Sequence, residues 1–293
     1  MNIKRRISGL RATLDSSREI RRLGATIDSS EWDSAILVAG MRRSGNHATI
    51  GWLANAYESA PTPLDYEWGG FGVSGTGVTV HLNDIRLHYR NQPIRLTEIR
   101  RQREKLSSLG GARRLILSVE DVTRREVDSS PLFDGRVDIR VHVHRSVLNL
   151  LASRLALIGT FDAKWGPQWR RWSPPIIPMD QGFLDRISED MTAAPDGWVV
   201  IDFDRWSTGE PAYRAALLER FGLSADIAPP VTGHGGGSSF TGTSVRPESG
   251  DLLSRWKDVE WPDELLDLLA LDRNRAILTE TESEQLQQLR RGR

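Results

Sequence analysis

The sequence predicts an α/β fold with a central, mostly parallel β-sheet flanked by helices on both faces. Four short segments rich in valine and isoleucine have the length and composition of buried strands, and three of them lead directly into segments with helical periodicity. Strands that alternate with helices are typical of βαβ units, whose parallel sheets are covered on both sides. Ligands of such sheets bind at the carboxyl ends of the strands, so the residues that follow each strand are the first candidates for a site.

The elements are expected in this order along the chain. The predicted strands are SAILVAG (34–40), RRLILSVED (113–121), VDIRVHVHR (137–145) and GWVVIDFD (197–204), and the predicted helices cover 46–57, 147–158 and 211–221. The Gly-rich segment 61–83 is compatible with a substrate-covering loop or with a small hairpin. The acidic, leucine-patterned tail over 263–288 predicts one or two packing helices.

Length and composition favour one large domain over residues 31–293. A chain of 293 residues with 39% hydrophobic content can bury a full core, and no Pro/Gly/Ser-rich linker divides it. Residues 1–30 form a basic extension that is expected to be helical. Two interpretations of this extension stay open: a solvated terminal helix, or a helix that makes weak contact with a membrane surface.

Charge and cysteine content exclude several classes of protein. Lys+Arg and Asp+Glu are both 39, which argues against a nucleic-acid polymer held on a generally basic surface. Cysteine is absent, so disulfides, thiolate catalysis and Cys-ligated zinc are excluded, and a cytoplasmic location is expected. No apolar run approaches the roughly 20 residues of a membrane span.

The segment GMRRSGNH, residues 40–47, predicts an anion site on a P-loop-type scaffold. A strand, a glycine-bounded loop and a helix direct backbone N–H groups and the positive end of a helix dipole at one point. The ATP-binding version of this loop requires G-x-x-x-x-G-K-[ST]. Gly40 and Gly45 have the right spacing, but Asn46 and His47 stand where lysine and a hydroxyl residue belong. A simple structural turn with solvent-facing arginines is the alternative at this point.

A second segment, HVHRSVLNLLASRLA, supports the anion site. Arg145 directly follows a predicted strand, and Ser153 lies eight residues later, about two helical turns along. A guanidinium at the strand end and a hydroxyl on the following helix can both contact one bound phosphate.

With these two motifs the sequence resembles the sulfotransferase family that uses 3'-phosphoadenosine 5'-phosphosulfate as donor, and needs no metal. The resemblance implies that MRRSGNHA holds the 5'-phosphosulfate and that Arg145 and Ser153 hold the 3'-phosphate. It also implies that the Gly-rich segment 233–242 closes over the 3'-phosphate. The donor-binding residues implied are Arg42, Arg43, Ser44, Gly45, Asn46, His47, Arg145, Ser153, Gly237, Ser238 and Ser239.

The chain departs from the family pattern at several positions. Arg43 stands where many cytosolic members have lysine, Asn46 and His47 replace a hydroxyl pair, and Ala48 stands where an aromatic residue often stacks on adenine. The Arg-Lys-Gly triplet of many members is missing from the C-terminal loop. Arginine can still bridge phosphate and sulfate oxygens through its planar fork.

Two residues are predicted to act in catalysis, Arg43 and Glu120. The acceptor loses a proton as it attacks sulfur, so a base is needed at a strand end. Glu120 and Asp121 follow the apolar run that ends at Val119, and Glu120 is the first choice, with Asp121 as the second. The alternative is an acidic pair that forms surface ion pairs with Arg124 and Arg125.

The spacing of the histidines relative to carboxylate residues does not indicate a metal site. His142 and His144 alternate on one strand face, where a buried structural imidazole is the favoured interpretation. His81 and His88 flank LNDIRL and are candidates for a position near the substrate, and they and His47 are further candidates for the base.

The acceptor is expected to be a small molecule or a carbohydrate that offers a hydroxyl or an amine. Several of the ten tryptophans lie in 162–175, where they form either an aromatic surface for a sugar or part of the core. Two other functions stay open on the same scaffold: a kinase-like phosphotransferase that needs magnesium and ATP, and a non-catalytic nucleotide-binding protein.

Overall fold

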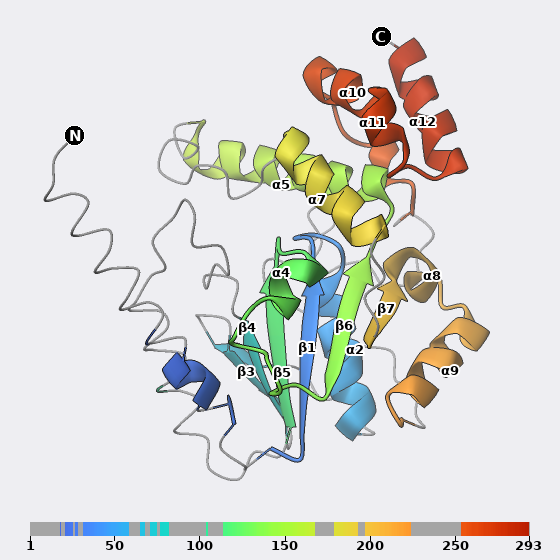
Figure 1. Cartoon of the computed structure of the whole chain (residues 1–293). Coiled ribbons are helices and arrows are strands. Elements are labelled where there is room, and N and C mark those ends of the chain that lie inside the picture. The colour runs from blue at the N-terminus through green and yellow to red at the C-terminus, as the bar shows by residue number, and fades with distance from the viewer. Residues whose placement is uncertain are drawn as a thin grey trace, which may run out of the picture. The chain divides into compact units, whose positions relative to one another are not determined.

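The computed structural model describes residues 18, 21–25, 27–28, 32–58, 65–67, 71–74, 77–81, 104, 114–167, 179–192, 197–223 and 253–292. Over these ranges the chain has the predicted α/β architecture, with a parallel central sheet flanked by helices (Figure 1). The strands are β1 (Ser34–Gly40), β2 (Asp65–Glu67), β3 (Phe71–Ser74), β4 (Gly77–His81), β5 (Arg114–Glu120), β6 (Ile139–His144) and β7 (Trp198–Asp202).

The strand order in the sheet is β2-β3-β4-β5-β1-β6-β7. The arrows of β5, β1, β6 and β7 point the same way, and β4 also pairs in parallel with β5 (Figure 1). At the other edge β3 runs antiparallel to both β2 and β4, and Ser74 of β3 pairs with Gly77 of β4. The described part of the Gly-rich segment therefore contains a small hairpin, one of its two predicted forms.

All four predicted strands are present; β1 has its predicted bounds, and β5, β6 and β7 are shorter than expected. The Asp202 carboxylate accepts hydrogen bonds from the backbone N–H groups of Asp204 and Arg205, at 3.0 and 3.2 Å. This N-cap ends β7 and starts a short helix, α8 (Phe203–Ser207), so the prediction of strand through residue 204 was wrong. Phe203 and Asp204 consequently lie in a helical turn at the end of β7.

The helices include the three that the sequence predicts, α2 (Asn46–Glu58), α5 (Val147–Trp165) and α9 (Pro211–Arg220). Helix α5 continues seven residues beyond its predicted end at 158. The tail forms three helices where one or two were expected. The remaining helices are α4 (Arg124–Asp128), α7 (Gln181–Thr192), η3 (Arg255–Lys257), α10 (Asp263–Leu269), α11 (Asp272–Arg275) and α12 (Glu280–Arg291).

The chain divides into two compact units, each with its own core. Unit 1 comprises 1–39, 62–142 and 195–199, and unit 2 comprises 40–61, 143–194 and 200–293, so the boundary falls within β6 and β7 and just before the last residue of β1. In unit 1 the apolar side chains of β1 and β5 pack with Phe133 and Trp198. Leu23 and Ile27 belong to this core, although both lie in the predicted N-terminal extension. Most of that extension, 1–17, lies outside the described residues.

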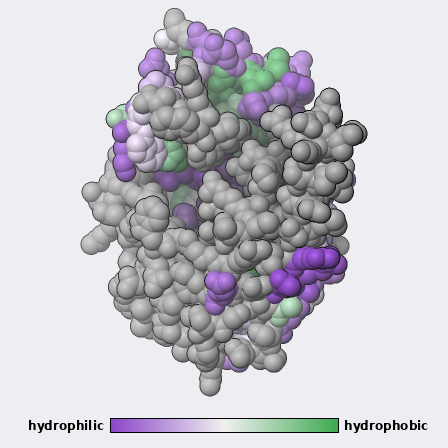
Figure 2. Space-filling model, turned by 90° about the vertical axis from the view of Figure 1, so that its left-hand side faces the viewer, coloured by the Kyte–Doolittle hydropathy of each residue, from purple (hydrophilic) through white to green (hydrophobic). Residues whose placement is uncertain are grey.

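The core of unit 2 is built on α5. Leu148 and Leu151 of this helix are fully buried and pack with α7, η3 and the C-terminal helices. Among the described residues, the large hydrophobic side chains that stay exposed are Trp165, Met191, Val200 and Leu271. Figure 2 shows a hydrophobic area bordered by hydrophilic residues at the top of its view.

Candidate functional site

The candidate site lies in unit 2, where β1, β6 and β7 end. The loop 41–45 connects β1 to α2, and its turn is closed by a hydrogen bond from the Ser44 N–H to the Met41 carbonyl, at 2.9 Å. Arg43 and Gly45 adopt positive φ angles of 78° and 109°. Because the first turn of a helix has amide N–H groups without intrahelical partners, the loop presents donors to an anion at the start of α2.

Two glycines allow this loop to pack tightly. A Cβ on Gly40 would lie 2.7 Å from the Val143 carbonyl oxygen and 2.6 Å from Asn46 Oδ1. A Cβ on Gly45 would lie 2.1 Å from Cδ2 of Phe203, the first residue of α8. The spacing of these glycines in the sequence therefore reflects close contacts with β6, α2 and α8.

A buried polar pair stabilises the loop and leaves one donor for a ligand. The Ser44 hydroxyl donates to Asn46 Oδ1 at 2.9 Å, and both side chains are almost fully buried. The Nδ2 atom of Asn46 has no hydrogen-bond partner among the described residues. A buried amide donor without a partner is costly, and an anion bound at the loop would satisfy it.

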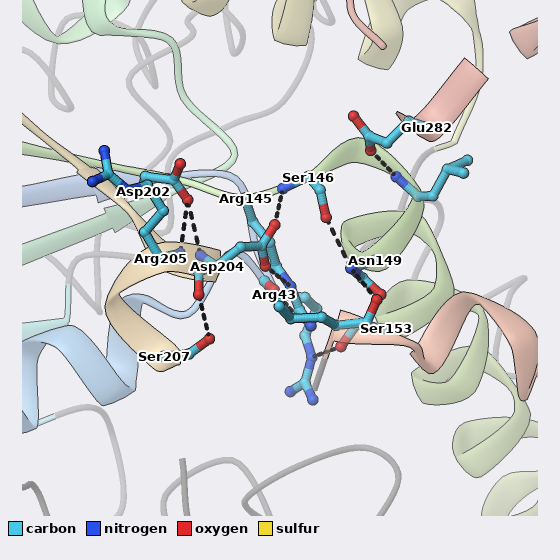
Figure 3. Close-up of polar contacts among 12 residues, drawn as sticks. Arg43, Arg145, Ser146, Asn149, Ser153, Asp202, Asp204, Arg205, Ser207 and Glu282 are labelled. Atoms are coloured by element: carbon cyan, nitrogen blue, oxygen red, sulfur yellow. Dashed lines mark hydrogen bonds and ion pairs between the residues drawn. The ribbon is translucent and has the colours of Figure 1, made fainter. Parts of the chain in front are cut away.

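The two predicted halves of the anion site contact each other (Figure 3). Arg43 Nε donates to Ser153 Oγ at 3.2 Å, and Arg145 Nη1 donates to the carbonyl of Arg43 at 3.2 Å. Arg145 and Ser153 are buried, with 4% and 2% of their surface exposed, and Arg43 is half-buried. Residues that are more than 100 positions apart in the chain thus form one cationic group.

Asp204 balances part of this charge. One carboxylate oxygen accepts a hydrogen bond from the Ser146 N–H at 2.8 Å, and the other lies 3.7 Å from Arg145 Nε. The guanidinium of Arg145 also lies over the Phe203 ring, 5.3 Å from its centroid. Burial lowers the pKa of Arg145 to about 10, although the Asp204 charge raises it. Arg145 is therefore still a cation at neutral pH.

The first turn of α5 is held by a distant carboxyl group. Glu282 of α12 is buried and accepts a hydrogen bond from the Leu148 N–H at 2.9 Å. Burial raises the pKa of this carboxyl, against hydrogen bonds from Leu148 and Thr279 that lower it. The interaction satisfies an amide that has no partner within α5 and fixes the helix that carries Ser153.

Some of the other predicted donor-binding residues lie in or next to the loop, and the rest lie outside the described residues. Arg42 lies in the loop and His47 in the first turn of α2, and both are half-buried. Gly237, Ser238 and Ser239 lie outside the described residues, so their predicted role is not tested.

The predicted base belongs to unit 1. Glu120 is the last residue of β5 and Asp121 follows it with a φ angle of 57°, so both lie at the carboxyl end of a sheet strand, as the sequence predicted. Both are half-buried. Their choice as base stays a prediction.

His142 has the structural position that was favoured from its sequence pattern. It is buried, and its ring packs edge-on against Trp198 at a centroid distance of 6.4 Å. His81 is the last residue of β4, and His88 lies outside the described residues.

Two residues described above, Asp204 and Glu282, were not identified from the sequence. Asp204 is the last residue of a predicted strand, a position that could have marked it. No sequence pattern marked Glu282, because its hydrogen-bond partner, Leu148, lies 134 positions away in the chain.

No group of three or more His, Asp or Glu side chains in the described part of the chain could hold a metal ion. None of the helices described has the length and apolar character that crossing a membrane requires.

Comparison with known proteins gave similarities to solved structures only. No protein-family model matches the chain, and no curated protein does. The mouse sulfotransferase SULT7A1 complexed with PAP is 12% identical, with 87% of this chain and 92% of that chain covered and a TM-score of 0.40. The sulfotransferase domain of the Synechococcus PCC 7002 olefin synthase is 16% identical, with 81% of this chain and 94% of that chain covered and a TM-score of 0.36. Both of these solved structures are sulfotransferases.

Proposed function

We propose that the protein is a sulfotransferase that moves a sulfuryl group from 3'-phosphoadenosine 5'-phosphosulfate to a hydroxyl or amine of a small-molecule or carbohydrate acceptor. The observation that carries this proposal is the 3.2 Å hydrogen bond between Arg43 Nε and Ser153 Oγ. It joins the loop expected to hold the 5'-phosphosulfate to the helix expected to hold the 3'-phosphate.

The loop supplies the donors that the 5' end of the nucleotide requires. In this proposal the anion is held by amide groups at the start of α2, by the hydrogen-bonded Ser44–Asn46 pair and by the half-buried Arg42 and His47. Asn46 and His47 replace the lysine and hydroxyl of an ATP-binding loop, so the chain lacks the groups that hold a terminal phosphate and magnesium there. This composition favours a phosphosulfate over a nucleoside triphosphate with its metal.

In this proposal, Arg43 binds beside the sulfuryl group that is transferred. The acceptor oxygen or nitrogen attacks sulfur, and the bond from sulfur to the bridging phosphate oxygen breaks, so 3'-phosphoadenosine 5'-phosphate leaves. Negative charge grows on that bridging oxygen in the transition state. A guanidinium placed beside it stabilises the transition state more than the ground state.

The remaining residues have two roles: they bind the 3'-phosphate of the donor and accept the proton of the acceptor. Arg145 and Ser153 donate to the 3'-phosphate, and Asp204 holds Arg145 in place. Glu120 takes the acceptor's proton as the new bond to sulfur forms, with Asp121 as the second candidate.

The decisive test is nucleotide selectivity in solution. Calorimetric titration of the wild type with 3'-phosphoadenosine 5'-phosphate, AMP and ATP, with and without magnesium, should show metal-independent binding of the first and much weaker binding of the others. In Arg145→Ala the first nucleotide should bind about ten- to a hundredfold more weakly, because a charge-assisted hydrogen bond contributes roughly 1.5–3 kcal/mol. Weak AMP binding should change little, which also shows that the variant is folded.

A matched variant controls for the loss of a positive charge. Arg205→Ala removes an exposed guanidinium of α8 that pairs with Glu210. It should leave nucleotide affinity unchanged. Magnesium-dependent ATP binding in the wild type would instead support a phosphotransferase, and transfer of radiolabelled sulfate to sugar, lipid-linked or phenolic acceptors would identify the second substrate.

A further inference from the structure

Helix α5 begins without the cap that its own sequence offers. Ser146 stands at the N-cap, where a serine usually accepts a hydrogen bond from the second or third amide of its helix, yet its side chain makes no such bond. Its Oγ accepts instead from Asn149 Nδ2, at 2.9 Å (Figure 3), and the same amide group donates to the Leu253 carbonyl, at 3.1 Å. The cap of α5 therefore comes from other parts of the chain.

Two carboxylates from distant helices supply this cap. The Ser146 N–H donates to Asp204 of α8 at 2.8 Å, and the Leu148 N–H donates to Glu282 of α12 at 2.9 Å. Both amides belong to the start of a helix, where no intrahelical acceptor is available. The start of α5 is thus fixed by residues that lie 58 and 134 positions further along the chain.

The Glu282 carboxylate caps two helices at once. Its Oε2 accepts from the N–H of Thr279, the N-cap of α12, at 3.1 Å, and Thr279 Oγ1 accepts from the Glu282 N–H at 3.2 Å. These two bonds form a capping box for α12 that needs no group from α5. The other oxygen, Oε1, accepts from Leu148, so one buried side chain fixes the start of α12 relative to the start of α5.

Apolar contacts also hold α12 against α5, but they position the turn less narrowly. Leu286 of α12 lies in the same buried core as Leu148. Hydrophobic contacts are non-directional, whereas a hydrogen bond weakens steeply when its geometry departs from linear. The bond to Glu282 therefore sets the position of the first turn of α5, and with it the residues on either side, Arg145 and Ser153.

We propose that Glu282 is a positioning residue for the anion site, and that it couples the docking of the C-terminal helices to the placement of Arg145 and Ser153. In this role Glu282 acts through the Leu148 N–H and not through contact with the ligand. That the ligand is the sulfuryl donor rests on the proposed function.

This role has a signature that a purely structural role lacks, because coupling between two sites is reciprocal. If the docked α12 improves anion binding, a bound anion stabilises the docked α12 by the same factor. Hydrogen exchange of the amides of α12 should therefore slow when 3'-phosphoadenosine 5'-phosphate binds the wild type. In Glu282→Ala this ligand-dependent slowing should be lost, because the bond from α12 to the first turn of α5 is gone.

Affinity is measured by calorimetry on four variants of the full chain, at a temperature where all of them are folded. Glu282→Ala should bind the nucleotide about two- to tenfold more weakly, the equivalent of one misaligned hydrogen bond. Glu282→Gln should recover most of this loss, since its carbonyl oxygen can still accept from Leu148. Two controls should bind like the wild type: Thr279→Ala, which removes the N-cap of α12 but keeps the bond to Leu148, and Glu284→Ala, which removes an exposed carboxylate of the same helix.

The positioning role and the proposed function can fail separately. Equal nucleotide affinity of Glu282→Ala and the wild type, or an equal loss in Thr279→Ala, refutes the positioning role and leaves the proposed function standing. Ligand-dependent slowing of exchange in α12 that persists in Glu282→Ala refutes it as well. If the wild type binds inorganic phosphate but not the nucleotide, the proposed function fails, and a loss of phosphate affinity in Glu282→Ala but not in Thr279→Ala still supports the positioning role. If neither anion binds the wild type, both are refuted.

Discussion

Substitution of Gly45 by alanine tests how the anion loop is built. Gly45 has a φ angle of 109°, and a Cβ there would lie 2.1 to 2.6 Å from three ring atoms of Phe203. The positive φ angle costs an L-residue about 1–2 kcal/mol. Forcing a methyl group into a well-packed contact costs about 1–3 kcal/mol more. The free energy of unfolding should therefore fall by about 2–5 kcal/mol in Gly45→Ala.

A second glycine separates the two contributions. Gly209 also has a positive φ angle, 74°, but a Cβ on it would meet no heavy atom within 4 Å. Gly209→Ala should thus lose only the conformational part, about 1–2 kcal/mol. Urea denaturation of both variants, extrapolated linearly to water, measures the difference.

The close contact between Gly45 and Phe203 also predicts weaker nucleotide binding in Gly45→Ala. Phe203 lies under the Arg145 guanidinium, and its ring centroid lies 5.5 Å from that of Trp206, so a displaced Phe203 disturbs the position of Arg145. In calorimetry, Gly45→Ala should bind 3'-phosphoadenosine 5'-phosphate more weakly than Gly209→Ala. Equal stabilities and equal affinities in the two variants would refute the tight packing of the loop on α8.

Three further predictions concern catalysis and pH. Arg43→Ala should lower kcat more than it weakens donor binding in steady-state assays, and a change in KM alone would show that Arg43 acts only in the ground state. Glu120→Gln should abolish turnover while donor affinity and melting temperature stay near wild type, and retained activity would move the base to Asp121 or to a histidine. Burial raises the pKa of Glu282 above its ordinary value of 4.5, so its stabilising effect is fully present below that pH and is lost as pH rises through the raised value. Melting temperatures from pH 4 to 8 should therefore fall in the wild type relative to Glu282→Gln, and parallel curves would contradict this.

Local sequence patterns determined the elements of the fold. The Val/Ile-rich segments and the helical periods predicted β1, β5, β6 and β7 and the helices α2, α5 and α9, because burial on both faces of a parallel sheet imposes a recognisable composition. The spacing of Gly40 and Gly45 predicted the loop, since glycine is required where backbone and ring approach this closely. Arg145 and Ser153 were predicted because two helical turns separate them.

Only the tertiary structure decided which groups meet these residues. The contact of Arg43 with Ser153 joins positions 110 apart, and the contact of Leu148 with Glu282 joins positions 134 apart. The ends of β1, β6 and β7 each supply part of the anion site, and their neighbours in space are set by strand order, which no local pattern encodes. Asp204 acquires its role for the same reason, because its carboxylate lies 3.7 Å from Arg145 Nε only in the folded chain.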